Sequence, residues 1–310
     1  MYVIGIGAKR INFTEMIRIL KTGEESIDSK ILAKRIPRTL FALIAGMSLS
    51  ISGVLMQSLT KNPIADPSIL GINTGASFGV VFAMAYLKIT SYYQFILFAL
   101  LGSTLAAILV FMIASGGKSG LNPIKLVISG AAISAGFSSI IKIILLPRQN
   151  IMSTFKLWQI GSISAAEYES LLAIIPFVLL AIIVTVIISP KLDILVLGDE
   201  IATGLGVNVK QTRLIATITS VVFCAVITAI AGPIAFLGLM VPNIVRAVIG
   251  SDIKRSIVYS ALFGSLFLTV SDICGRLLGA PGELEVGIIT SFIGAPVLIF
   301  IVMKNRYKAI

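Results

Sequence analysis

The chain contains no histidine and only two cysteines, and these absences exclude several kinds of chemistry. Without histidine it cannot form a Ser-His-Asp or Cys-His catalytic site, bind zinc through imidazole or ligate haem through histidine. Cys224 and Cys274 lie far apart within apolar runs, so they provide neither a disulfide framework nor a Cys-x-x-Cys metal or redox pair. We therefore expect no catalytic residue, no metal site and no cofactor on this chain.

Charged residues are also scarce, at 13% of 310 residues, whereas 57% of the residues are hydrophobic. A soluble domain usually carries about 25% charged residues, because its surface must interact with water. The formal net charge of +11 comes from basic residues that lie between apolar runs. Positive-inside topology and phospholipid head groups account for such residues, so the basic balance does not indicate nucleic-acid binding. The composition favours one helical bundle in lipid.

Long uncharged runs predict the membrane-spanning helices, since a helix needs about 20 apolar residues to cross the hydrocarbon core. The run 214–245 is too long for one crossing, and Ala231-Gly232-Pro233 is expected to divide it. We predict a single all-α polytopic membrane domain over residues 1–310, with about nine or ten transmembrane helices. The uncharged runs are 39–60, 67–87, 92–114, 126–141, 170–189, 214–245, 256–271 and 286–303.

The N-terminal region 1–34 departs from this pattern. Residues 1–8 are apolar but too short to cross a membrane, and 9–34 mix charges with apolar side chains, as in an amphipathic surface segment. We interpret 1–34 as a truncated first span plus an amphipathic segment. The alternative is that the true start lies upstream.

Two spans are rich in small residues, which let membrane helices approach closely. Helix packing is one interpretation, a polar wall of a translocation pathway is the other, and each can hold for a different face. The small residues are Gly46, Ser48, Ser50, Ser52 and Gly53 in one span and Gly130, Ala131, Ala132, Ser134, Ala135 and Gly136 in the other.

Basic residues in the connections predict the orientation of the bundle. A basic cluster on the opposite side runs against the positive-inside rule, and an interaction site would explain it. Lys142, near the outer end of its span, either reaches the lipid head groups or attracts an anionic ligand. The expected cytoplasmic residues are Lys61, Lys118, Lys191, Lys210, Arg213, Lys254, Arg255, Lys304, Arg306 and Lys308, and the opposite cluster is Lys30, Lys34, Arg35 and Arg38.

The longest polar segment on the predicted cytoplasmic side is 191–213, and we expect it to form a loop with a short helix. Asp199 and Glu200 suit the first turn of that helix, where carboxylates meet the positive end of the helix dipole. The segment Gly116-Gly117-Lys118-Ser119 is not a phosphate loop, because Met112 stands where that motif requires glycine. We therefore expect no nucleotide binding on this chain.

Short motifs in a fixed order resemble those of the FecCD-type permeases, the BtuC-like membrane subunits of ABC importers for iron-siderophores, haem and cobalamin. The resemblance covers about residue 34 to the end. Two positions depart from the usual family pattern: Asn243 replaces a common histidine and Glu285 a common proline. The motif residues are Arg35, Arg38, Gln57, Asn62, Pro63, Pro67, Gly71, Leu197, Gly198, Asp199, Glu200, Ala202, Leu205, Gly206, Gly232, Pro233, Gly238, Pro242, Asn243, Arg246, Asp272, Arg276, Glu283, Gly287 and Pro296.

This resemblance implies partners for both membrane faces. The segment 197–206 would be the coupling helix that docks into an ABC ATPase subunit, with Leu197, Gly198, Asp199, Glu200, Ala202, Leu205 and Gly206 as its residues. Arg35, Arg38 and Arg276 would receive acidic residues of an extracytoplasmic binding protein, with Pro37 stiffening the loop that carries the first two. Head-group anchoring of the first two, or pairing of Arg276 with Asp272 one turn earlier, are the alternatives.

The implied function is transport of a ferric siderophore across the bacterial cytoplasmic membrane by a homodimer or a pair of similar permeases. Haem or cobalamin is the alternative substrate. An ion-coupled secondary transporter is a different class of function, but such carriers commonly bury carboxylates or histidine, and this chain has almost none within its spans. A non-transport scaffold would leave the docking motifs unexplained.

Overall fold

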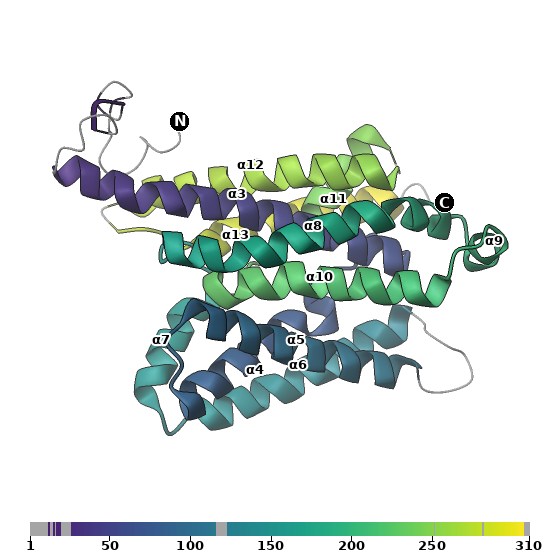
Figure 1. The fold of residues 1–310 in the computed structure, drawn as a ribbon, viewed down its shortest axis with the longest axis horizontal. Helices are drawn as coiled ribbons and strands as arrows, with labels where there is room; N and C mark the ends of the chain where they lie inside the picture. Colours follow the sequence, from purple (N-terminus) through teal and green to yellow (C-terminus); the bar gives the residue numbers. More distant parts are fainter. Residues whose placement is uncertain are drawn as a thin grey trace.

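The computed structural model describes residues 26–115, 123–250, 252–280 and 282–306, together with residues 12, 15 and 17–19. These residues form helices joined by short connections, and no strand occurs among them. Helix labels follow Figure 1. The segment 116–119 and most of the predicted N-terminal segment 1–34 lie outside the described residues.

Six of the described helices are long and apolar enough to cross a membrane, and three shorter apolar helices accompany them. Together these nine described helices correspond to the apolar runs, from which about nine or ten crossings are predicted. The predicted division lies at Gly232, which follows the last residue of α10 and has φ 72°. The long helices are α3 (Ile27–Thr60), α5 (Tyr92–Ser115), α6 (Pro123–Leu145), α8 (Tyr168–Val196), α10 (Val209–Ala231) and α12 (Ile253–Leu278); the shorter ones are α4 (Ile72–Phe82) with η2 (Ala83–Leu87), α11 (Leu237–Ile249) and α13 (Val286–Arg306).

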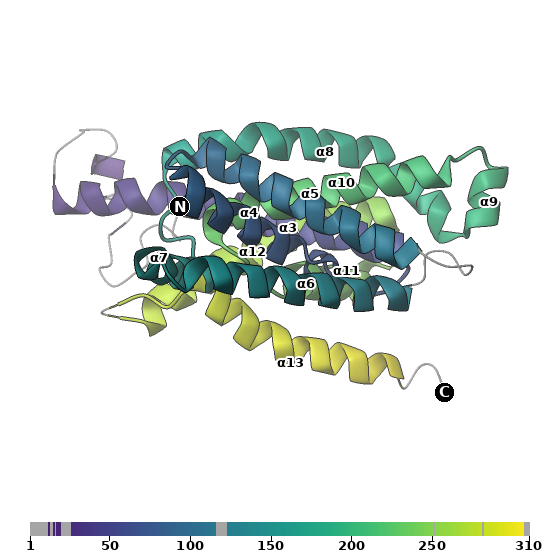
Figure 2. The same ribbon diagram turned by 90° about the horizontal axis from the view of Figure 1, so that it is seen from below.

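Three short helices occupy the connections: η1 (Pro67–Leu70), α7 (Gln149–Gln159) and α9 (Asp199–Gly204). Figure 1 shows α7 and α9 at opposite ends of the bundle, which we call the α7 end and the α9 end. Helix α3 begins at the α7 end and finishes at the α9 end (Figure 1). Figure 2 shows α7 joined to one end of α6, and α13 along one side of the bundle, where it contacts α11 and α12.

Helix α3 forms the centre of the bundle, packed against α8, α10, α11 and α12. Its small residues allow these contacts: a Cβ atom on Gly46 would overlap the backbone of Gly264 in α12, and one on Gly53 would overlap Gly238 in α11. Ser52 shares hydrogen bonds with Ser220 of α10, with the two hydroxyl oxygens 2.7 Å apart. The packing interpretation is therefore confirmed for α3. The small residues of α6 differ, since Ala131, Ala132, Ala135 and Gly136 are exposed.

The predicted loop at residues 35–38 is wrong, because α3 starts at Ile27 and runs through Pro37 without interruption. Ser26 and Ser29 form a capping box that fixes this start. The missing proline donor costs one hydrogen bond to the carbonyl four residues earlier, and the rest of a 34-residue helix tolerates that loss. The segment 191–213 is also mostly helical: only 197–208, which includes α9, connects α8 to α10.

Candidate functional site

At the α9 end, the segment 197–206 presents apolar side chains outside the bundle. Leu197, Ile201 and Leu205 are 61%, 52% and 61% exposed, whereas Ala202 is fully buried beneath them. Asp199 and Glu200 lie in the first turn of α9, as predicted. Gly198 and Gly206 have φ values of 125° and 80°, which favour glycine and fix the turns on either side of the helix. Large apolar side chains that are exposed close together in sequence at the end of the bundle are typical of an interaction surface.

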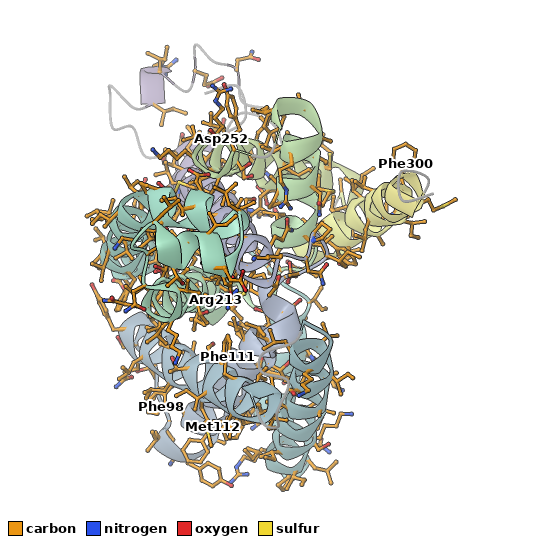
Figure 3. All side chains as sticks on the ribbon, turned by 90° about the vertical axis from the view of Figure 1, so that its right-hand side faces the viewer. Phe98, Phe111, Met112, Arg213, Asp252 and Phe300 are labelled. Atoms are coloured by element: carbon orange, nitrogen blue, oxygen red, sulfur yellow. The ribbon has the colours of Figure 1, made fainter. Side chains whose placement is uncertain are left out.

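Asp199 fastens α9 to two spans. Its carboxylate lies 3.2 Å from Nζ of Lys61, directly after α3, and 3.0 Å from Nη2 of Arg213 in α10. Both pairs border a cavity of about 330 Å³, and in Figure 3, which looks onto the α9 end, Arg213 and Phe111 lie close together beside it. Sequence reasoning treated Lys61 and Arg213 only as orienting charges, because neither is close to Asp199 in a recognisable motif.

The motif residues near the end of α3 meet those of α11. Gln57 donates from Nε2 to the carbonyl oxygen of Gly238 over 3.1 Å. Asn243 donates from Nδ2 to the carbonyl oxygens of Pro63 and Leu239, each over 2.7 Å. Asn243 thus makes two donor contacts from one nitrogen, and a neutral histidine, with one ring N–H, could not make both. Asn243, which stands where the family commonly has histidine, therefore joins α11 to the connection after α3 through this pair of hydrogen bonds.

The connection from α3 to α4 is held by its own side chains. Asn62 accepts from the backbone N–H of Ile64 over 3.0 Å, and Asp66 accepts from the N–H of Ser68 over 2.8 Å at the start of η1. Burial raises the pKa of the Asp66 carboxyl above its usual value, and hydrogen bonds from Ser68 oppose that rise. Gly71 then adopts φ 68° between η1 and α4. These local contacts fix the turns of the connection.

At the α7 end, a cluster of ion pairs joins α3, α12 and the connection that follows α12. Arg38 donates from Nε to Oδ1 of Asp272 over 2.8 Å and pairs with Glu283. Arg276 lies 3.0 Å from Oδ2 of Asp272, so the pairing predicted as an alternative is confirmed. Arg38 and Arg276 are 8% and 2% exposed, whereas Arg35 is partly exposed. Among the predicted docking arginines, Arg35 therefore offers the most surface.

Further motif residues assemble at the same end. The backbone N–H of Gly287 donates to the carbonyl of Gly161 over 2.9 Å, and the N–H of Ser162 donates to the carbonyl of Ala231 over 2.7 Å. The segments that contain Gly161 and Gly232 approach each other closely, because a Cβ atom on Gly232 would overlap the carbonyl oxygen of Trp158. The connection between α7 and α8 is thereby fixed against the point where α10 ends. Over the described ranges, no three His, Cys, Asp or Glu side chains form a group that could hold a metal ion.

This bundle of long and short apolar helices, interrupted at Gly232 after α10, is that of a multi-pass membrane protein. The model of the FecCD transport family matches residues 1–304, and the chain belongs to that family. The Fe(3+)-citrate import system permease protein YfmD of Bacillus subtilis (strain 168) is 35% identical over 304 residues, covering 98% of this chain and 90% of its own length. The ferric enterobactin transport system permease protein FepD of Escherichia coli (strain K12) is 37% identical over 301 residues, covering 97% and 90%.

Two solved structures share the fold. An inward-facing conformation of an ABC transporter assigned to the metal-chelate type superimposes with a TM-score of 0.83 and 26% identity, covering 97% of this chain and 94% of the other. PsaBC from Streptococcus pneumoniae, solved in complex with Fab, gives a TM-score of 0.63 at 17% identity, covering 94% and 95%. The BtuC-like permease fold predicted from the motifs is confirmed.

Proposed function

We propose that this chain is the membrane subunit of a binding-protein-dependent ABC importer that carries a ferric chelate across the bacterial cytoplasmic membrane. The observation that carries the proposal is the segment 197–206 around α9, where Leu197, Ile201 and Leu205 are exposed at the end of the bundle. On this proposal the α9 end faces the cytoplasm and receives an ABC ATPase. The relatives named for Fe(3+)-citrate and ferric enterobactin support iron chelates as the substrate class.

The chain performs no covalent chemistry in this scheme. A separate ATPase hydrolyses ATP, and its closure moves α9 and switches the exposure of the pathway between the two membrane faces. A binding protein delivers the chelate at the α7 end, where Arg35 is accessible. A second permease copy or a similar permease completes the pathway, and the exposed small residues of α6 (Ala131, Ala132, Ala135 and Gly136) suit such a close contact.

Uptake by vesicles tests the proposal. Vesicles that contain the permease, its ATPase and its binding protein are expected to accumulate radiolabelled ferric citrate or ferric siderophore only when ATP is present. Collapse of the proton gradient with an ionophore is expected to leave this uptake unchanged. Uptake that follows the proton gradient instead would establish a secondary carrier, and uptake of haem or cobalamin in place of ferric chelates would overturn the substrate class.

A further inference from the structure

A second cavity, of about 420 Å³, lies at the α7 end between α4, α6 and α7. Its volume is within the range of small-ligand sites, about 300–1,000 Å³. Figures 1 and 2 both show these three helices gathered where α7 joins α6. The lining residues are Asn73, Thr74 and Ser77 of α4, Ser138, Ile141, Lys142 and Leu145 of α6, Met152, Phe155, Lys156 and Gln159 of α7, and Pro233.

The cavity has a positive and donor-rich lining. Lys142 lies one turn after Ser138 on α6, and Lys156 lies one turn before Gln159 on α7, so each helix contributes a lysine and an uncharged polar residue. No acidic residue lines the cavity. Within the described part of the chain, neither lysine forms an ion pair. The two ammonium charges are therefore available to a bound anion.

Asn73 adds an oriented donor. Its side-chain oxygen accepts from Oγ1 of Thr228 over 3.1 Å and from Sγ of Cys224 over 3.0 Å. Because two α10 side chains occupy that oxygen, the hydrogen-bonding groups that Asn73 offers to the cavity are its two amide N–H bonds. A carboxylate or catecholate oxygen accepts such bonds, and its charge is complementary to the lysines.

We propose that this cavity, which we call the α7 pocket, binds the transported ferric chelate as an anion through Lys142 and Lys156. This inference rests on the proposed function and specifies its substrate class. Three hydroxamates each lose one proton, and their three negative charges balance the ferric charge, so their complex is neutral. Citrate and catecholate ligands lose more protons and leave the complex negative. The α7 pocket selects the negative class, and an anionic lipid head group is the rival source of the same oxyanion chemistry.

The protein contains its own reporter of this site. Trp158 is the only tryptophan of the chain, and its ring lies 5.7 Å from the ring of Phe155, which lines the α7 pocket. A ferric complex held there would quench tryptophan emission. Binding can thus be measured on the full permease chain in vesicles of phosphatidylcholine, without the binding protein and without transport.

The experiment titrates ferric citrate, a ferric tricatecholate and a neutral ferric trihydroxamate against the wild-type chain and against Lys142→Gln, Lys156→Gln and the double variant. Lys142→Arg and Lys156→Arg test whether charge suffices. Lys88→Gln is the matched control, because Lys88 is exposed after η2 and does not line the α7 pocket. We expect each glutamine variant to weaken binding of the anionic chelates about two- to fivefold and the double variant about tenfold, as for partly solvated ion pairs. The arginine variants and Lys88→Gln should bind as the wild type does.

Three results would overturn the proposal. The first is equal binding of the anionic chelates by the wild type and the double variant, and the second is binding of the neutral trihydroxamate by the wild type as tight as that of the anionic chelates. The third is quenching that phosphatidylglycerol in the vesicles suppresses in the wild type but not in the double variant. The last would identify a lipid head group as the ligand. ATP-dependent uptake of ferric chelates by the complete importer would persist in all three cases if the proposed function holds. Loss of that uptake in the wild type would instead refute the proposed function.

Discussion

At the scale of single residues, the ion pairs of the α7 end distinguish a stabilising arginine from one that is suited to recognition, although both belong to the same arginine motif. Arg38 and Arg276 are buried against Asp272, whereas Arg35 is partly exposed. Removing one member of a buried pair leaves an uncompensated charge, which typically costs about 3–5 kcal/mol. Removing a partly exposed charge costs little. Arg38 therefore serves stability and Arg35 is suited to recognition, although the sequence presents them as one motif.

We predict that Arg38→Met destabilises the protein by about 3 kcal/mol, since Asp272 and Glu283 each lose a partner. The midpoint of thermal unfolding of the solubilised chain measures this loss. Arg35→Met is the matched control: its midpoint should stay near that of the wild type, while docking of the binding protein weakens. Equal midpoints for the two variants would show that the buried cluster does not stabilise α3 against α12.

The same residues show why sequence reasoning reached only part of the site. Asp272 and Arg276 are one helical turn apart, so their pairing could be predicted. Arg38 pairs with Asp272 across 234 positions of sequence, and only the packing of α3 against α12 brings them together. The loop expected around Pro37 was wrong because the strong capping at Ser26 and the length of α3 outweigh one missing donor.

At the scale of helices, the prediction from sequence was more complete. Crossing helices follow from length and apolar composition, both of which are local properties, and the division between α10 and α11 follows from Gly232 and Pro233. The sequence did not predict how α9 is attached to the rest of the bundle. Its ion pairs reach the residue after α3 and the second turn of α10, two spans that pack against each other. On the proposed function, these pairs are a route by which α9 acts on both spans.

We predict that Asp199→Ala uncouples ATP hydrolysis from transport without loss of ATPase binding. The partly exposed pairs with Lys61 and Arg213 contribute about 0–1 kcal/mol, so the thermal midpoint should hardly change. The number of ATP molecules hydrolysed per chelate imported should rise, because α9 moves without moving α3 and α10. Glu200→Ala, the same truncation at the neighbouring residue, is the control, because Glu200 forms no ion pair with another described residue. An unchanged ratio for Asp199→Ala would refute this coupling route.

At the scale of the whole molecule, the nine apolar helices of the described chain place the start of α3 and the end of α13 on opposite faces of the membrane if each of them crosses once. An impermeant maleimide tests this arrangement. Lys88→Cys, after η2, should react from outside intact cells, and Thr203→Cys, in α9, only after the membrane is permeabilised. The parental chain controls for Cys224, which is buried, and for Cys274, which is partly exposed. Reaction of both variants from the same side would require an even number of crossings between them and would contradict the fold.

The short length of α11 has a consequence for hydration. Its 13 residues extend about 20 Å, less than the roughly 30 Å of hydrocarbon, so the non-helical segment 232–236 must make up the remaining depth. Backbone N–H and C=O groups at that depth cannot face lipid and must meet protein or water. Pro233 borders the α7 pocket, and water in that cavity would meet this requirement. A charged chelate entering there would keep part of its hydration shell while already below the membrane surface.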